Sequence, residues 1–156
     1  IDINNYDIND LNLYLNAIFD IKFGSTSLIN EELKDKKIIF DNFEFETVFT
    51  DKHFVFMFLI ESTNPDYIIK LIDKELKNIT ITEEELERKK KLLKSIVQFR
   101  SDNVFDINHK IVDNVIRYGD VVLDDYKLID SLNINKANEI INNLDFSNKT
   151  ITIMHK

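Results

Sequence analysis

Apolar residues recur at helical spacing near the start of the chain. These residues are Leu11, Leu15, Ile18 and Phe19, and their spacing predicts a helix with one buried face. Gly24 follows this stretch, and glycine often ends a helix in the left-handed conformation. Ser25 or Thr26 is expected to cap a second, short helix, because a hydroxyl oxygen can accept a hydrogen bond from the first helical turn.

The period then changes from helical to alternating. Residues 43–47 alternate apolar and polar side chains, which indicates a half-buried strand. Residues 50–52 resemble a hairpin turn, and residues 54–60 are apolar at every position. A strand that is apolar on both faces is typical of the centre of a sheet. We therefore expect residues 54–60 to be covered on both sides.

Capping residues mark several helix starts in the second half of the chain. Asn64 and Pro65 have the order of an N-cap followed by proline at the first helical position. Thr82 and Glu85 have the spacing of a capping box, which predicts the start of a long helix. Asn133 is expected to cap the last helix.

Two further helices and a final strand complete the prediction. Residues 107–116 have an amphipathic pattern that ends at Gly119, and residues 126–132 suggest a short helix. Residues 150–154 alternate threonine and isoleucine before a methionine, which indicates an edge or closing strand.

This order of elements predicts an α+β fold in one domain, residues 1–156. The expected architecture is a small, mainly antiparallel sheet with helices packed on one face, a two-layer sandwich. Three strands make a thin sheet for this much helix. One or more strands are therefore expected upstream of Ile1, and the chain is interpreted as a fragment of a larger protein.

Composition and charge exclude several classes of partner. The 156 residues include no cysteine, which excludes disulfides and thiolate metal sites. A net charge of −8 opposes nucleic-acid binding, which depends on Lys and Arg contacts to phosphates. No apolar run approaches the ~20 residues of a membrane-spanning helix. Neither nucleic acid nor a membrane is expected as a partner, and a cytoplasmic location is expected because no export signal is seen.

The three histidines do not form a zinc motif. His53, His109 and His155 are far apart in sequence, and none stands in His-x-x-x-His, His-Glu-x-x-His or His-x-x-Glu-His. We interpret them as solvent-facing or hydrogen-bonded side chains. No metal ligand is assigned, and no cofactor is expected in this chain.

Other catalytic patterns are also missing. Ser25 stands after Gly24 but lacks the Gly-x-Ser-x-Gly pattern of a hydrolase nucleophile. Residues 83–85 are all glutamate and residues 124–125 are both aspartate, and these acids are interpreted as favourable charges at helix N-termini. The sequence therefore predicts no catalytic, cofactor-binding or metal-binding residue, and its substrate-binding residues are unknown.

One binding mode follows from the predicted hairpin itself. The edge beside residues 54–60 is expected to be able to accept an extended peptide by strand addition. A purely structural sheet is the alternative interpretation of the same pattern.

Several landmarks in order resemble the pitrilysin/insulysin family of zinc peptidases, including its members similar to the mitochondrial processing peptidase. The resemblance covers about residues 11–156. It rests on a Phe-Gly-x-Ser-Ser-like segment before a Leu-containing helix, a two-stranded stretch, a polar-Pro-Asp helix start, a capped long helix, a helix after a Ser-Leu-Thr-like turn, and a final strand. These are residues 23–33, 43–49 with 54–60, 64–66, 82–100, 131–144 and 151–154.

The resemblance implies a non-catalytic C-terminal domain. In this family an inverted zinc motif, His-x-x-Glu-His with a downstream Glu, lies in an N-terminal half, and that motif is not in this sequence. Some members place an Arg and a Tyr of the second half near the scissile bond, but residues 51–62 contain neither. The implied function is peptide binding and chamber closure, with the catalytic half or a partner subunit and a peptide substrate as partners and zinc held by the absent half.

Three interpretations stay open. The chain is either part of an active zinc metalloendopeptidase, inactive alone, or an interaction or scaffold subunit derived from the same fold. A self-sufficient enzyme is the third reading, and it would require histidines brought together by the fold.

Overall fold

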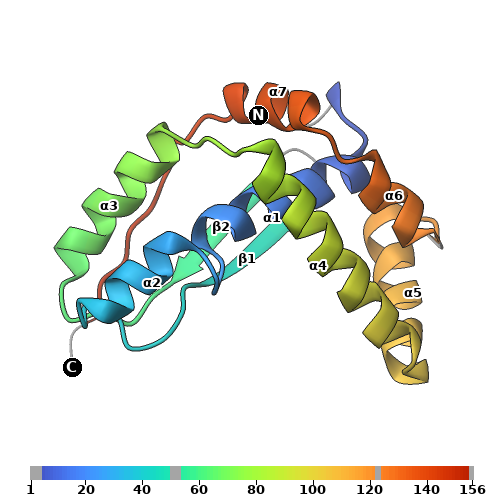
Figure 1. The fold of residues 1–156 in the computed structure, drawn as a ribbon, viewed down its shortest axis with the longest axis horizontal. Helices are drawn as coiled ribbons and strands as arrows, with labels where there is room; N and C mark the ends of the chain where they lie inside the picture. The colour runs from blue at the N-terminus through green and yellow to red at the C-terminus, as the bar shows by residue number, and fades with distance from the viewer. Residues whose placement is uncertain (1–4, 50–53, 122–123, 155–156) are drawn as a thin grey trace.

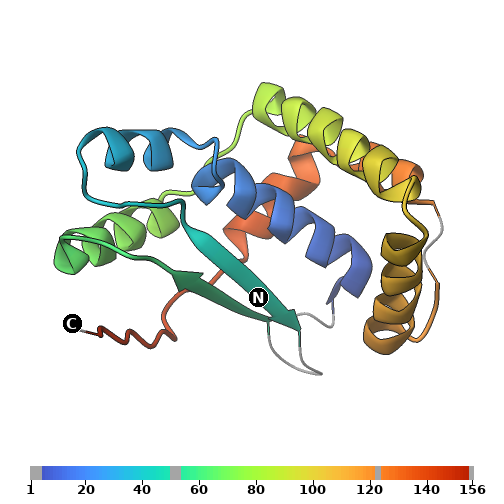
Figure 2. The same ribbon diagram turned by 90° about the horizontal axis from the view of Figure 1, so that it is seen from below.

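The computed structural model describes residues 5–49, 54–121 and 124–154. Over these residues the protein has the α+β architecture predicted from the sequence, with helices on one face of an antiparallel hairpin (Figures 1 and 2). The described elements, in chain order, are α1 (Ile8–Phe23), α2 (Leu28–Asp35), β1 (Glu44–Phe49), β2 (Phe54–Leu59), α3 (Pro65–Lys77), α4 (Glu83–Ser101), α5 (Val104–Tyr118), α6 (Asp125–Ser131) and α7 (Ile134–Asn142).

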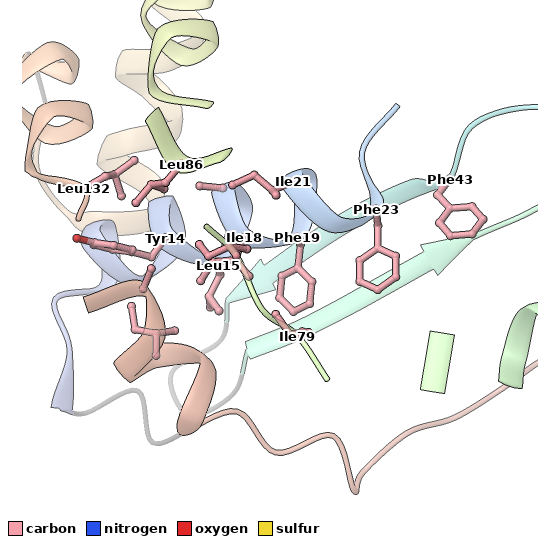
Figure 3. Packing of buried hydrophobic residues seen from close by; sticks show 14 of the residues in the cluster. Tyr14, Leu15, Ile18, Phe19, Ile21, Phe23, Phe43, Ile79, Leu86 and Leu132 are labelled. Carbon is pink, nitrogen blue, oxygen red and sulfur yellow. The ribbon is translucent and has the colours of Figure 1, made fainter. Parts of the chain in front are cut away.

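Helix α1 forms the centre of the hydrophobic core. Asp7 caps it by accepting hydrogen bonds from the N–H groups of Asn9 and Asp10. Figure 3 shows the side chains of α1 meeting Ile79, Leu86 and Leu132 from later parts of the chain. The face predicted between Leu11 and Phe19 is buried, so the predicted helix is confirmed. The buried residues of α1 are Leu11, Tyr14, Leu15, Ala17, Ile18, Phe19, Ile21 and Phe23.

Gly24 ends α1, but not in the predicted left-handed conformation. Its φ is −64°, which any residue can adopt. Its N–H donates to the carbonyl oxygen of Asp20 at 2.8 Å. A side chain on Gly24 would collide with that carbonyl oxygen and with the Asp20 carboxylate. Glycine is needed here for its lack of a side chain.

We expect Gly24→Ala to lower the free energy of unfolding by about 2 kcal/mol, the cost of forcing an extra group into a filled space. Urea denaturation followed by circular dichroism measures this change. Ser25→Ala is the matched control because Ser25 is the exposed neighbour, and its effect should stay within about 0.5 kcal/mol. Equal midpoints for the two variants would show that Asp20 moves aside without cost.

The cap of α2 differs from the predicted one. Ser27, and not Ser25 or Thr26, is the N-cap, and its hydroxyl oxygen accepts a hydrogen bond from the N–H of Asn30 at 3.3 Å. Ser25 and Thr26 are exposed in the preceding turn. The pattern of hydroxyl residues predicted the helix start but not which of three neighbouring residues would cap it.

The other predicted helix ends are confirmed. Asn64 caps α3 with Pro65 at its first turn, and Thr82 and Glu85 form a reciprocal capping box at α4. Gly119 ends α5 at a φ of 72°, in the left-handed region that favours glycine. Asn133 caps α7. Among the described residues no helix is long and apolar enough to cross a membrane.

The strand predictions are partly wrong. β1 and β2 pair antiparallel, as expected, and the predicted turn at residues 50–52 lies outside the described residues. β2 was expected to be covered on both faces, but its residues alternate between half-buried and exposed. Residues 150–154 were expected to form a strand, yet they are exposed and pair with neither described strand. Helices supply only one covering layer, so the second apolar face of β2 stays bare.

Candidate functional site

The inner face of the hairpin is held by aromatic side chains of α1. Phe19 stacks on Phe56 with ring centroids 3.9 Å apart, and Phe23 meets Phe58 edge-on at 4.9 Å. Phe45 of β1 stacks on Phe56 across the hairpin at 5.2 Å. These contacts set which face of the hairpin turns toward the helices.

The opposite face, which we call the bare face, is exposed. In the antiparallel register Glu44 lies opposite Leu59, Glu46 opposite Met57, and Val48 opposite Val55. Side chains alternate between the two faces of a strand, so these pairs share one face. All six side chains are exposed, and Leu59 reaches 64%. The bare face therefore consists of an apolar row on β2 beside Val48 and two carboxylates on β1.

The bare face is suited to binding and carries no obvious catalytic group. Its valine, methionine and leucine side chains offer apolar contact, and Glu44 and Glu46 offer charge to basic side chains. No nucleophile with a neighbouring base occurs among its six residues, which acyl-transfer chemistry would require. The arrangement supports contact with an extended polypeptide that has apolar and basic side chains.

A second exposed apolar surface lies at the junction of α4 and α5. Phe99 is 78% exposed, and Val104 and Phe105 are 69% and 77% exposed. We call these three residues the helical tip. Asn103 caps α5 between them by accepting a hydrogen bond from the N–H of Phe105 at 2.9 Å. Figures 1 and 2 show α5 standing apart from the strands.

A shallow hollow lies between α1, α5 and α6. Its volume is about 160 Å³, below the roughly 300 Å³ at which small-molecule pockets begin. Asp125, one of its lining residues, forms an ion pair with Lys110. The hollow is too small to be the main functional site. Its lining residues are Asn9, Asn12, Leu13, Asn16, Asn114, Asp125 and Leu128.

Of the three histidines, only His109 lies within the described residues. His109 is exposed on α5, whereas His53 and His155 lie outside the described residues. Within residues 5–49, 54–121 and 124–154 no group of three or more His, Asp or Glu side chains is arranged to hold a metal ion.

The predicted helix N-terminal acids are placed as expected. Residues 83–85 lie in the first turn of α4, and Asp124 caps α6 by accepting a hydrogen bond from the N–H of Lys127 at 2.9 Å. Asp125 is in the first turn of α6. These carboxylates stabilise helix starts and form no separate site.

Asn30 is an important polar residue that the sequence did not reveal. It is fully buried, and its amide donates to the carbonyl oxygens of Phe23 and Gly24 at 2.6 and 2.9 Å. Its side-chain oxygen accepts a hydrogen bond from the N–H of Phe43 at 3.1 Å. Asn30 therefore joins the end of α1 to the start of the hairpin, and so positions the bare face. No sequence signal distinguishes it from the many other asparagines.

The fold is similar to that of known peptidase structures. A crystal structure described as a putative M16-like peptidase from Alicyclobacillus acidocaldarius matches with a TM-score of 0.75 and 18% identity, over 85% of this chain and 32% of that one. The periplasmic protease PqqL from Escherichia coli matches with a TM-score of 0.57 and 13% identity, over 85% of this chain and 15% of that one. No protein-family model matches the chain, and no curated protein matches it.

These similarities are structural. The chain spans about a third or less of the length of the two structures it matches. The element order that suggested a peptidase resemblance in the sequence is thus also the order of a fold found in M16-like peptidases. At these identities the comparison shows a common fold, and the activity of this chain is a separate question.

Proposed function

We propose that this chain is a peptidase-fold domain that contributes to peptide binding and chamber closure, while hydrolysis takes place elsewhere in a larger protein. The observation that supports this most strongly is the fold match to an M16-like peptidase over 85% of the chain. The bare face provides a surface for the peptide, and the proposed partners are a catalytic half or partner subunit and a peptide substrate. Zinc is proposed to be bound by that catalytic half.

The chemistry of the bare face indicates which peptides it would favour. Val55, Met57 and Leu59 would contact apolar side chains, and Glu44 and Glu46 would attract Lys or Arg. An extended peptide suits such a face because its side chains also alternate at a period of two. The cytoplasmic location expected from the sequence stays a prediction, and one structural relative is described as periplasmic.

We expect the isolated chain to hold no stoichiometric zinc and to cleave no peptide, and we expect cleavage once the remainder of the parent protein is added. Metal analysis and a fluorogenic peptide assay measure these results. In the reconstituted protein, replacing Met57 and Leu59 by lysine should raise the KM for an apolar, basic peptide about tenfold, because contact surface is lost and like charge is added.

Leu28→Lys is the control for that double variant, since Leu28 is an exposed leucine on α2 outside the bare face. It should leave KM unchanged. Stoichiometric zinc together with peptide cleavage by the isolated chain would contradict the proposal. A KM unaffected by the double variant would place the peptide on another surface.

An interaction or scaffold role is the second candidate, and the helical tip favours it. Three large apolar side chains exposed together are characteristic of protein contact surfaces. If the reconstituted protein holds no zinc and cleaves nothing, while Phe99→Ser and Phe105→Ser abolish assembly with its partner, this second role is the correct one.

A further inference from the structure

Helix α5 contributes no described residue to the hydrophobic core. Every other described helix has at least one buried residue. None of residues 104–116, the part of α5 whose side chains the structure describes, is buried. On its inner side Ile111 is half-buried, and the ammonium group of Lys110 pairs with the carboxylate of Asp125 on α6. Figures 1 and 2 show α5 at the end of the molecule away from the C-terminus, so its outer side is open to a partner.

The outer side of α5 is apolar along the length of the helix. With 3.6 residues per turn, five apolar positions fall within about 120° of the helix circumference. We call these five residues the α5 stripe. A stripe of this kind normally faces a core, and one that faces solvent indicates a contact surface. Its residues and their exposed fractions are Val104 (69%), Phe105 (77%), Val112 (57%), Val115 (47%) and Ile116 (76%).

The α5 stripe has the arrangement that a two-fold contact with a second copy requires. Val104 and Phe105 form one apolar pair, and Val115 and Ile116 form another pair eleven residues later. Eleven residues make about three helical turns, so the two pairs face the same side and lie about 16 Å apart. In an antiparallel contact between two α5 helices, the first pair of each copy would meet the second pair of the other copy. Such self-complementarity is the condition for a closed two-fold dimer.

The apolar area of the α5 stripe also fits a dimer interface. A phenylalanine side chain covers about 150–250 Å², and valine and isoleucine cover less, so the stripe exposes apolar area on the order of 500 Å². A standard interface buries about 800 Å² on each partner, of which somewhat more than half is apolar. The two areas agree. The net charge of −8 on each copy opposes association, but salt screens this repulsion.

We propose that α5 is a homodimer interface, in which the α5 stripes of two copies pack antiparallel about a two-fold axis near the middle of the helix. A second copy of this chain then covers Val104 and Phe105 of the helical tip. The inference goes beyond the proposed function, because it concerns neither the bare face nor hydrolysis. Its test needs neither zinc nor a peptide, so its failure would leave peptide binding at the bare face unaffected.

Analytical ultracentrifugation of the chain measures the dissociation constant of the dimer. We expect a constant on the order of 10 μM. It should become at least threefold smaller when NaCl is raised from about 50 to about 500 mM, because salt screens the repulsion between the copies and does not weaken apolar contact.

Two substitutions in the contact should change the dissociation constant in opposite directions. Ile116→Lys should raise it at least tenfold, because the two-fold axis introduces the charge twice. Asn108 is an exposed polar residue in the same 120° sector, roughly midway along α5. Asn108→Leu should therefore lower the constant at least threefold, because it adds apolar contact area.

Leu28→Lys on α2 and Met57→Lys on the bare face are the matched controls, since both residues are exposed and lie outside the α5 stripe. They should leave the dissociation constant unchanged, and circular dichroism verifies that all variants are folded. A chain that stays monomeric up to about 1 mM would overturn the proposal, as would a dimer that Met57→Lys dissociates and Ile116→Lys does not. A full-length parent protein that stays monomeric where this chain dimerises would also overturn it, since the remainder of the parent would then cover α5.

Discussion

We expect the replacement of Phe19 by alanine to lower the free energy of unfolding by about 3–5 kcal/mol, the range for truncating a buried phenylalanine. Phe19 is fully buried on α1. Its ring stacks on Phe56 at 3.9 Å and meets Phe146 edge-on at 6.3 Å, so it joins α1, the hairpin and the segment after α7. Removing the ring leaves a cavity in a close-packed core. Three separate parts of the chain surround this cavity, so they cannot easily move together to fill it.

Urea denaturation of the unmodified protein and of the Phe19→Ala variant measures this difference in the free energy of unfolding. Phe99→Ala is the matched control, because it removes the same ring from a residue that is 78% exposed. Its effect is expected to stay within about 0.5 kcal/mol, as for most surface substitutions. If both variants lost the same stability, Phe19 would not be the centre of the core described above.

The second large effect is expected at Asn30. Asn30→Ala removes the donor to the Phe23 carbonyl oxygen and the acceptor of the Phe43 N–H. It also removes one of two donors to the Gly24 carbonyl oxygen, which still accepts from the N–H of Ser27. These groups lie in the interior, and each buried group left without a partner costs about 1–3 kcal/mol. Water entering the vacated space would satisfy some of them, so we expect a loss of about 3 kcal/mol in total.

Asn30→Asp tests the hydrogen bonds that the Asn30 side chain donates separately from the one that it accepts. The carboxylate still accepts from the Phe43 N–H, but it cannot donate to the carbonyl oxygens of Phe23 and Gly24, and it introduces a buried charge. We expect this variant to be at least as unstable as Asn30→Ala at neutral pH, with part of the loss recovered at acidic pH, where protonation removes the charge and restores one donor. Denaturation curves at two pH values measure this.

Asn138→Ala provides the comparison, since Asn138 is an exposed asparagine on α7. Alanine favours helix at such a position, so stability should be unchanged or slightly higher. Full stability of Asn30→Ala would mean that the junction between α1 and the hairpin does not depend on this amide.

Helix starts and ends were well predicted because their signals are local. The Thr82 and Glu85 pair and the Asn64–Pro65 pair satisfy the free N–H groups of the turn that they begin, and this requires only neighbouring residues. The left-handed residue at Gly119 is local in the same way. Gly24 was predicted for the wrong reason, because its close approach to Asp20 depends on how the chain leaves α1.

The candidate site was the least predictable part. Seven successive apolar residues, 54–60, indicated a strand covered on both sides, and nothing local shows which face the helices will cover. Contacts of Phe19 with Phe56 and of Phe23 with Phe58 determine the inner face and leave Met57 and Leu59 in solvent. Whether the second edge of β2 and residues 150–154 pair with a strand likewise depends on the tertiary structure, and the described sheet contains only β1 and β2.

The sequence by itself determined the α+β class, the order of helices and strands, and most helix caps, because these follow from side-chain period and from hydrogen bonds within one turn. Only the tertiary structure decided that Asn30 joins α1 to the hairpin, that one face of β2 is bare, and that residues 150–154 lie unpaired beside its edge. The physical reason is that these features depend on contacts between residues far apart in the chain. The residues next to a given position in the sequence do not determine which distant groups it will contact.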